Sequence, residues 1–267
     1  MTQSAHENIR KAVREQYGKV AKSDDDGCCT SAPSCCDESG TDAQTASMAL
    51  GYSTEEVGTV PDGANMGLGC GNPHAIASLK RGETVLDLGS GGGFDCFLAA
   101  KEVGQSGQVI GVDMTTEMLS KARSNVERTG YENVEFRLGE IEHLPVADGT
   151  IDVILSNCVI NLSPEKAKVF QETFRVLKPG GRLAISDIVA TAELPESVKS
   201  DMALFTGCMA GASPVADIES MLKGAGFEEI RIEPKDESRE FIRDWHPDSK
   251  IEDFILSATI EAIKPKV

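Results

Sequence analysis

Short apolar runs alternate with amphipathic segments along most of the chain. Runs rich in β-branched and other apolar residues cover 84–88, 108–113, 134–138, 151–157 and 182–187. Between the last two runs, Phe170, Phe174 and Leu177 recur at helical spacing, which predicts a helix over 165–177. Because strands that alternate with helices form βαβ units, the pattern predicts a parallel sheet covered by helices.

The C-terminal part of the chain predicts the end of this sheet. The helix over 165–177 is expected to stop at the Lys178-Pro-Gly-Gly181 turn, since proline and glycine terminate helices. After a helix near 214–224, residues 227–232 and 254–263 predict two further strands. The expected fold class is α/β, with a seven-stranded, mostly parallel sheet and an antiparallel C-terminal hairpin.

The N-terminal region has a different pattern. Ile9, Val13 and Tyr17 lie at steps of four and predict a short amphipathic helix over 8–22. The segment 23–40 is rich in Ser, Asp, Gly and Pro and holds four cysteines, with no apolar period that would offset the entropy of ordering. We expect a mobile, cysteine-rich arm there.

Composition narrows the classes of partner. The chain has 43 acidic and 26 basic residues, a net charge of -17, which argues against a nucleic-acid partner. No apolar stretch approaches the roughly 20 residues that span a bilayer, and the first residues lack the layout of a secretory signal, so we expect a cytoplasmic protein without a membrane partner. In a reducing cytosol the eight cysteines would remain thiols, which points to metal, metalloid or redox chemistry.

A glycine-rich turn joins an apolar strand to a helix over 85–94. Such a turn brings a ligand close to bare backbone at a helix N-terminus and indicates a nucleotide-type cofactor. The dinucleotide fingerprint requires glycine or alanine where this chain has Phe94, so a different cofactor is expected. The alternative is that the glycines only make a tight turn, since glycine tolerates positive φ.

The spacing Gly89-x-Gly91-x-Gly93, preceded by Asp87, resembles the first motif of class I methyltransferases. The resemblance implies a Rossmann-like fold and S-adenosylmethionine as the cofactor. The cofactor-binding residues that it implies are Asp87, Gly89, Ser90, Gly91, Gly93, Asp113, Met114, Gly139, Glu140, Ile141 and Asn157.

Two further elements follow this motif in the order that the class requires. Asp113 ends the second predicted strand, where a carboxylate accepts hydrogen bonds from both ribose hydroxyls. The alternative is that Asp113 caps the helix that begins near Thr115, and the two roles are compatible. The segment 139–145 resembles the one that lines the adenine, with Ile141 as the apolar contact; the alternative is a surface loop.

Several cysteines fall where the acceptor is expected to bind. Cys158 follows the strand over 151–157, at the position where amino-group methyltransferases often carry an Asn-Pro-Pro-aromatic element. Since ligands of open α/β sheets bind at the carboxyl ends of the strands, we expect Cys158 at the mouth of the site. Cys70, in a glycine loop ahead of a helix capped by Asn72, approaches the same mouth. The alternative is a cysteine that only fills apolar space, which is our interpretation of Cys96.

The chain resembles the arsenite methyltransferases over nearly its whole length. The matching pieces are Tyr17-Gly-Lys19, the cysteine-bearing arm, 69–73, 87–96, 156–162 and Gly207-Cys208. Of these, the Cys-Val-Ile-Asn-Leu element at 158–162 is the most distinctive. The resemblance implies that Cys158 and Cys208 hold arsenic(III) as substrate through each transfer.

The same resemblance implies roles for further thiols. Cys70 matches a third thiol, and one of Cys28 or Cys29 matches a fourth. Cys35 and Cys36 form an additional pair that the family pattern does not require. The implied domains are 1–47, with the N-terminal helix and the arm, and 48–267, the methyltransferase domain, in which the segment around 190–215 covers the acceptor site.

The chemistry of arsenic fits these residues. Trivalent arsenic is soft and binds thiolates, by extension of the rule for soft metal ions. Its own lone pair attacks the methyl carbon, so positioning replaces a general base, and the four histidines form no evident catalytic pair. Methylation formally oxidises arsenic, and two neighbouring thiols that become a disulfide would reduce it again. A thiol reductant, thioredoxin or glutathione, is therefore an expected co-substrate and partner.

Two other functions compete with this one. A methyltransferase for a small organic acceptor, such as a quinone precursor, would share the Leu177-Lys-Pro-Gly-Gly181 turn but leaves the thiols unexplained. A non-enzymatic soft-metal-binding protein would need only the Cys28-Cys29 and Cys35-Cys36 pairs, whose spacing fits zinc poorly.

Overall fold

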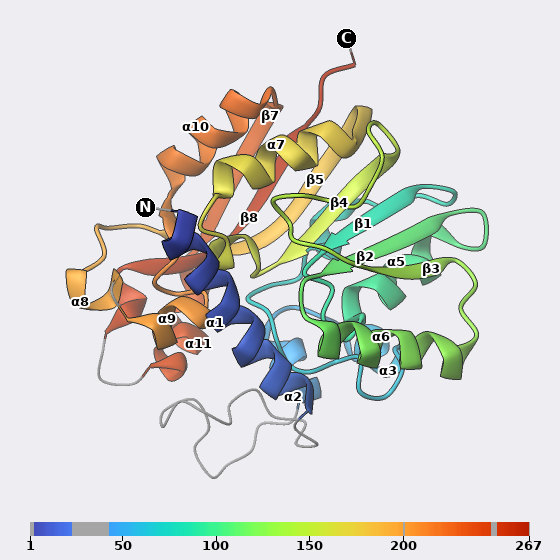
Figure 1. Cartoon of the computed structure of the whole chain (residues 1–267), viewed down its shortest axis with the longest axis horizontal. Helices are drawn as coiled ribbons and strands as arrows, with labels where there is room; N and C mark the ends of the chain where they lie inside the picture. Colours follow the sequence, from blue (N-terminus) through green and yellow to red (C-terminus); the bar gives the residue numbers. More distant parts are fainter. Residues whose placement is uncertain (1–2, 23–42, 200, 247–249, 267) are drawn as a thin grey trace.

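An eight-stranded sheet forms the centre of the molecule (Figure 1). The computed structural model describes residues 3–22, 43–199, 201–246 and 250–266. The strands are β1 (Thr84–Leu88), β2 (Gln108–Asp113), β3 (Val134–Leu138), β4 (Ile151–Asn157), β5 (Leu177–Ala190), β6 (Ser213–Pro214), β7 (Glu228–Lys235) and β8 (Ile255–Ile263). The first four coincide with the strands predicted from the sequence.

The strand order is β3-β2-β1-β4-β5-β8-β7, and the short β6 pairs with β5. The first five of these strands are parallel, whereas β8 runs antiparallel to both β5 and β7. The predicted mostly parallel sheet with an antiparallel C-terminal hairpin is confirmed, with β6 as an additional short strand.

Helices cover both faces of this sheet and one end of it. The α-helices are α1 (Gln3–Lys22), α2 (Ala43–Ala49), α3 (Thr54–Thr59), α4 (His74–Ala77), α5 (Phe94–Val103), α6 (Thr116–Thr129), α7 (Lys166–Val176), α8 (Glu196–Lys199), α9 (Met202–Thr206), α10 (Val215–Ala225) and α11 (Arg239–Trp245). Three short 3-10 helices are η1 (Ile160–Leu162), η2 (Asp236–Ser238) and η3 (Ile251–Asp253). None of the described helices is both long and apolar enough to span a membrane.

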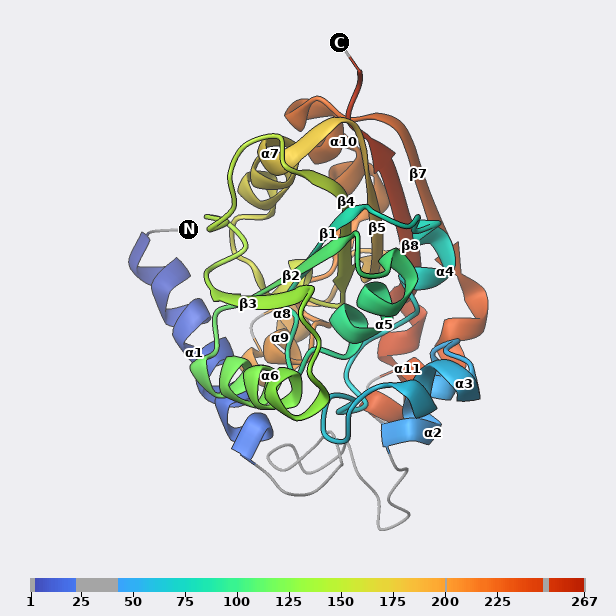
Figure 2. The ribbon, with the colours of Figure 1, turned by 90° about the vertical axis from the view of Figure 1, so that its right-hand side faces the viewer.

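Alternate strand residues supply the two layers of the core, as the two-residue period of a strand requires. On one face, Leu86 and Leu88 of β1 pack in a cluster with Phe170 of α7 and Leu222 of α10. On the other face, Val85 packs in a second cluster that includes residues of α5 and α6. Figure 2 shows α7 and α10 on the opposite side of the sheet from α5.

The boundary between α7 and β5 differs from the prediction. The helix ends at Val176, and the Lys178-Pro-Gly-Gly181 segment belongs to β5 instead of forming a separate turn. Leu177 pairs with Ile151 of β4, and the backbone of this segment exchanges hydrogen bonds with Lys264 near the C-terminus. Pairing with residues distant in sequence therefore extends the strand backwards.

The predicted N-terminal helix is confirmed and begins earlier, at Gln3. Helix α1 packs on α6, α9 and η1, and lies at one edge of the molecule beside α6 in the view of Figure 2. The predicted arm within 23–42, with Cys28, Cys29, Cys35 and Cys36, lies outside the described residues. The domain boundary after residue 47 falls inside α2 and stays a prediction.

Candidate active site

The glycine loop between β1 and α5 needs its glycines for both conformation and space. Gly89, Gly91 and Gly93 have φ of 66°, 50° and 94°, in the left-handed region that favours glycine. A Cβ on Gly89 would lie 2.2 Å from Cγ2 of Val159, which follows Cys158. The loop therefore lies directly against the segment that carries the first predicted acceptor thiol.

Asp113, at the end of β2, is buried beside this loop. Its Oδ2 accepts a hydrogen bond from the Gly91 N–H at 3.0 Å, and its Oδ1 accepts one from the Thr115 N–H at 2.8 Å. Asp113 thus holds the loop and the start of α6 together. Each carboxylate oxygen has a second lone pair, which fits the predicted acceptance of ribose hydroxyls. The Ser90 hydroxyl is buried with no hydrogen-bond partner among the described residues, as expected of a group that a ligand satisfies.

Asp87 has an unexpected partner. Its buried carboxylate accepts a hydrogen bond from the Cys96 thiol at 3.2 Å. Burial, together with the nearby Asp95 carboxylate, raises the pKa of Asp87 well above its usual value. Cys96 is fully buried in α5, so the interpretation as a structural cysteine agrees with its position, and the thiol donor adds a role that the sequence did not indicate.

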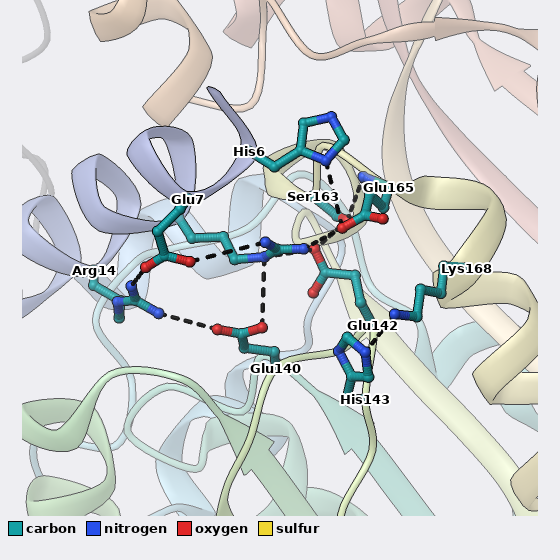
Figure 3. Close-up of polar contacts among 10 residues, drawn as sticks. His6, Glu7, Arg14, Glu140, Glu142, His143, Ser163, Glu165 and Lys168 are labelled. Atoms are coloured by element: carbon teal, nitrogen blue, oxygen red, sulfur yellow. Dashed lines mark hydrogen bonds and ion pairs between the residues drawn. The ribbon is translucent and has the colours of Figure 1, made fainter. Parts of the chain in front are cut away.

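The segment predicted to line the adenine lies next to Asp113. The Gly139 N–H donates a hydrogen bond to the Asp113 carbonyl at 3.1 Å, and Ile141 packs against the core. Glu140 points to α1, where it pairs with Arg14 at 3.1 Å (Figure 3). Met114 contacts a different neighbourhood, an apolar cluster that contains Cys158 and Cys208. The predicted cofactor residues therefore border the predicted thiol site.

Three cysteines distant in sequence converge at this border. Cys158 follows β4, Cys208 follows α9, and Cys70 precedes α4. The Sγ atoms of Cys70 and Cys158 and a carboxylate oxygen of Asp187 all lie within 4.8 Å of one another. The Cys208 thiol donates a hydrogen bond to the Cys158 carbonyl at 2.7 Å. The three cysteines predicted to hold arsenic are therefore neighbours, and all three are free thiols.

Two of these cysteines have an uncommon backbone conformation. Cys158 and Cys208 have φ of 58° and 65°, in the left-handed region that costs a non-glycine residue about 1 to 3 kcal/mol. The Cys158 N–H donates to the Ser186 carbonyl at 2.8 Å, and the Cys208 N–H donates to the Phe205 carbonyl at 3.0 Å. A tertiary bond thus holds the Cys158 backbone, whereas a local turn and the thiol bond to the Cys158 carbonyl hold Cys208; strained positions of this kind are typical of functional sites.

Asn157 joins the third cysteine to β4. Its Oδ1 accepts a hydrogen bond from the Cys70 N–H at 3.0 Å, and its Nδ2 donates to the Gly71 carbonyl at 2.8 Å. Nδ2 also donates to the Tyr52 hydroxyl at 3.0 Å, and that hydroxyl donates to Asp95 at 2.6 Å. Asn157 was predicted to bind the cofactor; in the structure its amide bonds with the loop of Cys70.

Tyr52 and Asp187 were missed by the sequence analysis. Asp187 accepts hydrogen bonds from the Ile160 N–H at 3.0 Å and from Asn161 Nδ2 at 2.9 Å, and so fixes the turn after Cys158. It is the last residue of the strand predicted over 182–187, where a polar residue signals a site, and it lies within β5 in the structure. Tyr52 lies in 43–60, where no periodicity points to a site.

The pKa values of the three thiols and of Asp187 are raised. Burial raises the pKa of the Cys70 thiol to about 11. The hydrogen bond with Cys158, followed by burial, raises the pKa of Cys208 well above its usual value. A hydrogen bond from Cys208 lowers the pKa of Cys158, but the contact with Cys70 and burial outweigh it. Burial also raises the pKa of Asp187 to about 6.

Comparison with known proteins relates this geometry to a family. A family model for a methyltransferase domain matches residues 79–237. An arsenite methyltransferase of Halobacterium salinarum is 57% identical over 266 residues, 97% of this chain and 67% of the relative. An arsenite methyltransferase of Aquipseudomonas alcaligenes is 40% identical over 84% of this chain and 63% of the relative. The crystal structure of an arsenic(III) S-adenosylmethionine methyltransferase from Chlamydomonas reinhardtii has a TM-score of 0.60 and 34% identity, over 83% of this chain and 73% of that one.

The sheet order and the glycine loop define a class I methyltransferase fold. Within this class, the chain belongs to the arsenite methyltransferase family. It spans about two thirds of the length of these two relatives.

The raised thiol pKa values predict a specific pH dependence of alkylation. In the folded protein, the rate of Cys70 modification by iodoacetamide should rise about tenfold per pH unit from pH 7 to pH 10, because only the thiolate reacts and its pKa is near 11. In urea the rate of Cys70 modification should level off above about pH 8.5, because that is the pKa of a free cysteine thiol. Mass spectrometry of the Cys70 peptide gives both rates. A plateau below pH 9 in the folded protein would contradict a neutral thiol.

Proposed function

We propose that this protein transfers a methyl group from S-adenosylmethionine to trivalent arsenic held by Cys70, Cys158 and Cys208. The observation that supports the proposal most strongly is the convergence of these cysteines beside Met114, next to the buried Asp113. An amino or hydroxyl acceptor would not require three thiols. The names of the two relatives and of the algal structure agree with this acceptor.

Neutral thiols suit the capture of arsenous acid. Each As–S bond that forms replaces an As–O bond, and the thiol proton leaves with the displaced hydroxide as water. Three thiols therefore exchange three hydroxides for three waters, and no net charge is buried. Had the free thiols been ionised, the protein would have had to stabilise adjacent buried anions, which is costly. The raised pKa values of the three thiols are thus compatible with their role as ligands.

In the transfer step, the protein contributes by positioning the reactants. S-adenosylmethionine supplies an electrophilic methyl group, and arsenic attacks it with its own lone pair. The acceptor loses no proton, so the site needs no general base. The histidines agree with this: His74 is buried against Asp95 and Glu102, and His143 of the predicted adenine segment contacts Lys168 of α7 (Figure 3). Holding arsenic in line with the methyl carbon is the contribution of the strained cysteines.

Reduction completes the proposed cycle. Methylation takes arsenic formally from the trivalent to the pentavalent state. Two thiolates that form a disulfide release two electrons, which return arsenic to the trivalent state. A thiol reductant of the thioredoxin or glutathione class then restores the thiols, and Cys28 or Cys29 is the proposed fourth thiol. Because the cycle needs reduced thiols, we propose the cytoplasm as its location.

The acceptor is tested with labelled S-adenosylmethionine, arsenite and excess thiol. The parent protein should form labelled methylarsenicals, and Cys158→Ser should lose at least about 100-fold in rate, because a hydroxyl is a poor ligand for a soft ion. The matched control is Cys96→Ser, which keeps a donor for Asp87 and should retain activity. Chromatography with arsenic-specific detection separates the products. No labelled arsenical from the parent, despite binding of S-adenosylmethionine, would favour an organic acceptor.

The source of the electrons is tested in a single turnover without external thiol. One equivalent of trivalent methylated product should appear together with one new disulfide per chain, because the two electrons come from two cysteines. Differential alkylation and mass spectrometry identify the oxidised pair. Trivalent product without any cysteine oxidation would refute the disulfide step.

A further inference from the structure

A buried arginine in α1 sits among three carboxylates of the cofactor side of the molecule. The Arg10 Nε lies 3.3 Å from a Glu142 oxygen and 3.5 Å from a Glu140 oxygen, and its guanidinium also pairs with Glu165. The side chains of Arg10 and Glu142 are only 9% and 3% exposed. Ion pairs as buried as this one are sensitive to the loss of one partner, unlike pairs on the surface.

Two of these carboxylates belong to the segment that adjoins the cofactor residues, and Glu165 precedes α7. Glu140 and Glu142 lie on either side of Ile141, one and three residues after Gly139, whose N–H bonds with the Asp113 carbonyl. Figure 3 shows Glu7 and Arg14 of α1, Glu140 and Glu165 meeting at this point, so that α1 is tied to two loops of the methyltransferase domain. A change at Arg10 is therefore transmitted to the position of residues 139–142.

The same face of α1 reaches the thiol site. Arg10, Val13 and Tyr17 are spaced by three and four residues and thus share one side of the helix. Val13 and Tyr17 belong to the apolar cluster that contains Met114, Cys158 and Cys208. The Tyr17 hydroxyl donates to the Thr206 carbonyl at 3.3 Å, two residues before Cys208. One rigid helix therefore contacts the adenine segment at Arg10 and the acceptor cover at Tyr17.

We propose that Arg10 is a positioning residue that fixes α1 across both sites, so that cofactor and arsenic each strengthen the binding of the other. Either ligand orders the segment next to it, and the helix transmits that order because it is bonded to both segments. Without Arg10, Glu142 keeps the Ser163 hydroxyl as a partner at 2.7 Å and Glu140 keeps Arg14 at 3.1 Å, but the buried cation that lies between Glu140, Glu142 and Glu165 is gone. The adenine segment is then tied to α1 only through the more exposed Arg14–Glu140 pair, and the link between the sites is lost. This inference rests on the proposed function for the identity of the second ligand.

The test uses two binding measurements on the full chain. S-adenosylhomocysteine is titrated by calorimetry with and without saturating arsenite, and arsenite is titrated by the fluorescence of the single tryptophan, Trp245, which packs against the cluster that contains Cys70. In the parent protein saturating arsenite should increase the affinity for S-adenosylhomocysteine by about tenfold, and S-adenosylhomocysteine should increase the affinity for arsenite by the same factor. Arg10→Gln should lower the affinity for S-adenosylhomocysteine by about tenfold and abolish the coupling between the two ligands. The matched control is Lys11→Gln on the exposed side of α1, where Lys11 pairs with Glu15. This variant should change neither the affinity for S-adenosylhomocysteine nor the coupling.

A second variant separates positioning from folding. In Arg10→Gln/Glu142→Gln the buried unpaired carboxylate is gone, so the urea midpoint should recover toward that of the parent while the coupling stays absent. Coupling that returns with stability would show that Arg10 acts only on folding and would overturn the proposal. So would a parent protein that binds both ligands independently. If the parent binds no arsenite, the coupling falls together with the proposed function, whereas the effect of Arg10→Gln on S-adenosylhomocysteine alone still decides whether Arg10 positions the cofactor segment.

Discussion

The side-chain amide of Asn157 is the contact on which the thiol site depends. It lies at the carboxyl end of β4, immediately before Cys158, and bonds with the backbone of Cys70 and Gly71. A single residue thereby fixes two cysteines that are distant in sequence. The same amide reaches Tyr52, which bonds with Asp95 in the first turn of α5, so the thiol site and the glycine loop share one hydrogen-bond network. Such buried networks favour a single arrangement when every member is satisfied.

The rest of the site follows from where the parallel strands end. β1, β2 and β4 end in the glycine loop, Asp113 and Asn157, and their carboxyl ends meet at one edge of the sheet. Segments from outside the sheet then close this edge: α1 from one side, and the loop after α9 with Cys208 from another. Cys70 and Cys208 are buried and Cys158 is half-buried, and the pKa of each thiol is raised, which suits the proposed substrate, a neutral hydroxide whose oxygens leave as water.

Much of this arrangement was predictable from local patterns. Four strands matched because each is a short apolar run bounded by polar residues, and the convergence of Cys158 and Cys70 followed from the strand-end rule. The predicted start of β5 was wrong, because pairing of Leu177 with Ile151 overrides the turn preference of the Pro-Gly-Gly sequence. Asn157 was assigned to the cofactor because its position in the class was visible, whereas its bonds with the Cys70 loop depend on tertiary structure. The burial of Arg10 could not be predicted for the same reason, since a charged residue on an amphipathic helix is expected to be exposed unless its partners are known.

If Cys70, Cys158 and Cys208 together hold trivalent arsenic, three sulfur atoms surround it. X-ray absorption at the arsenic edge counts its neighbours directly, on protein loaded with one equivalent of arsenite and carrying serine in place of Cys28, Cys29, Cys35 and Cys36. We expect three sulfur neighbours and no oxygen, and loss of one sulfur in the further variant Cys70→Ser. A first shell that keeps oxygen, or one unchanged by Cys70→Ser, would contradict a three-thiol site.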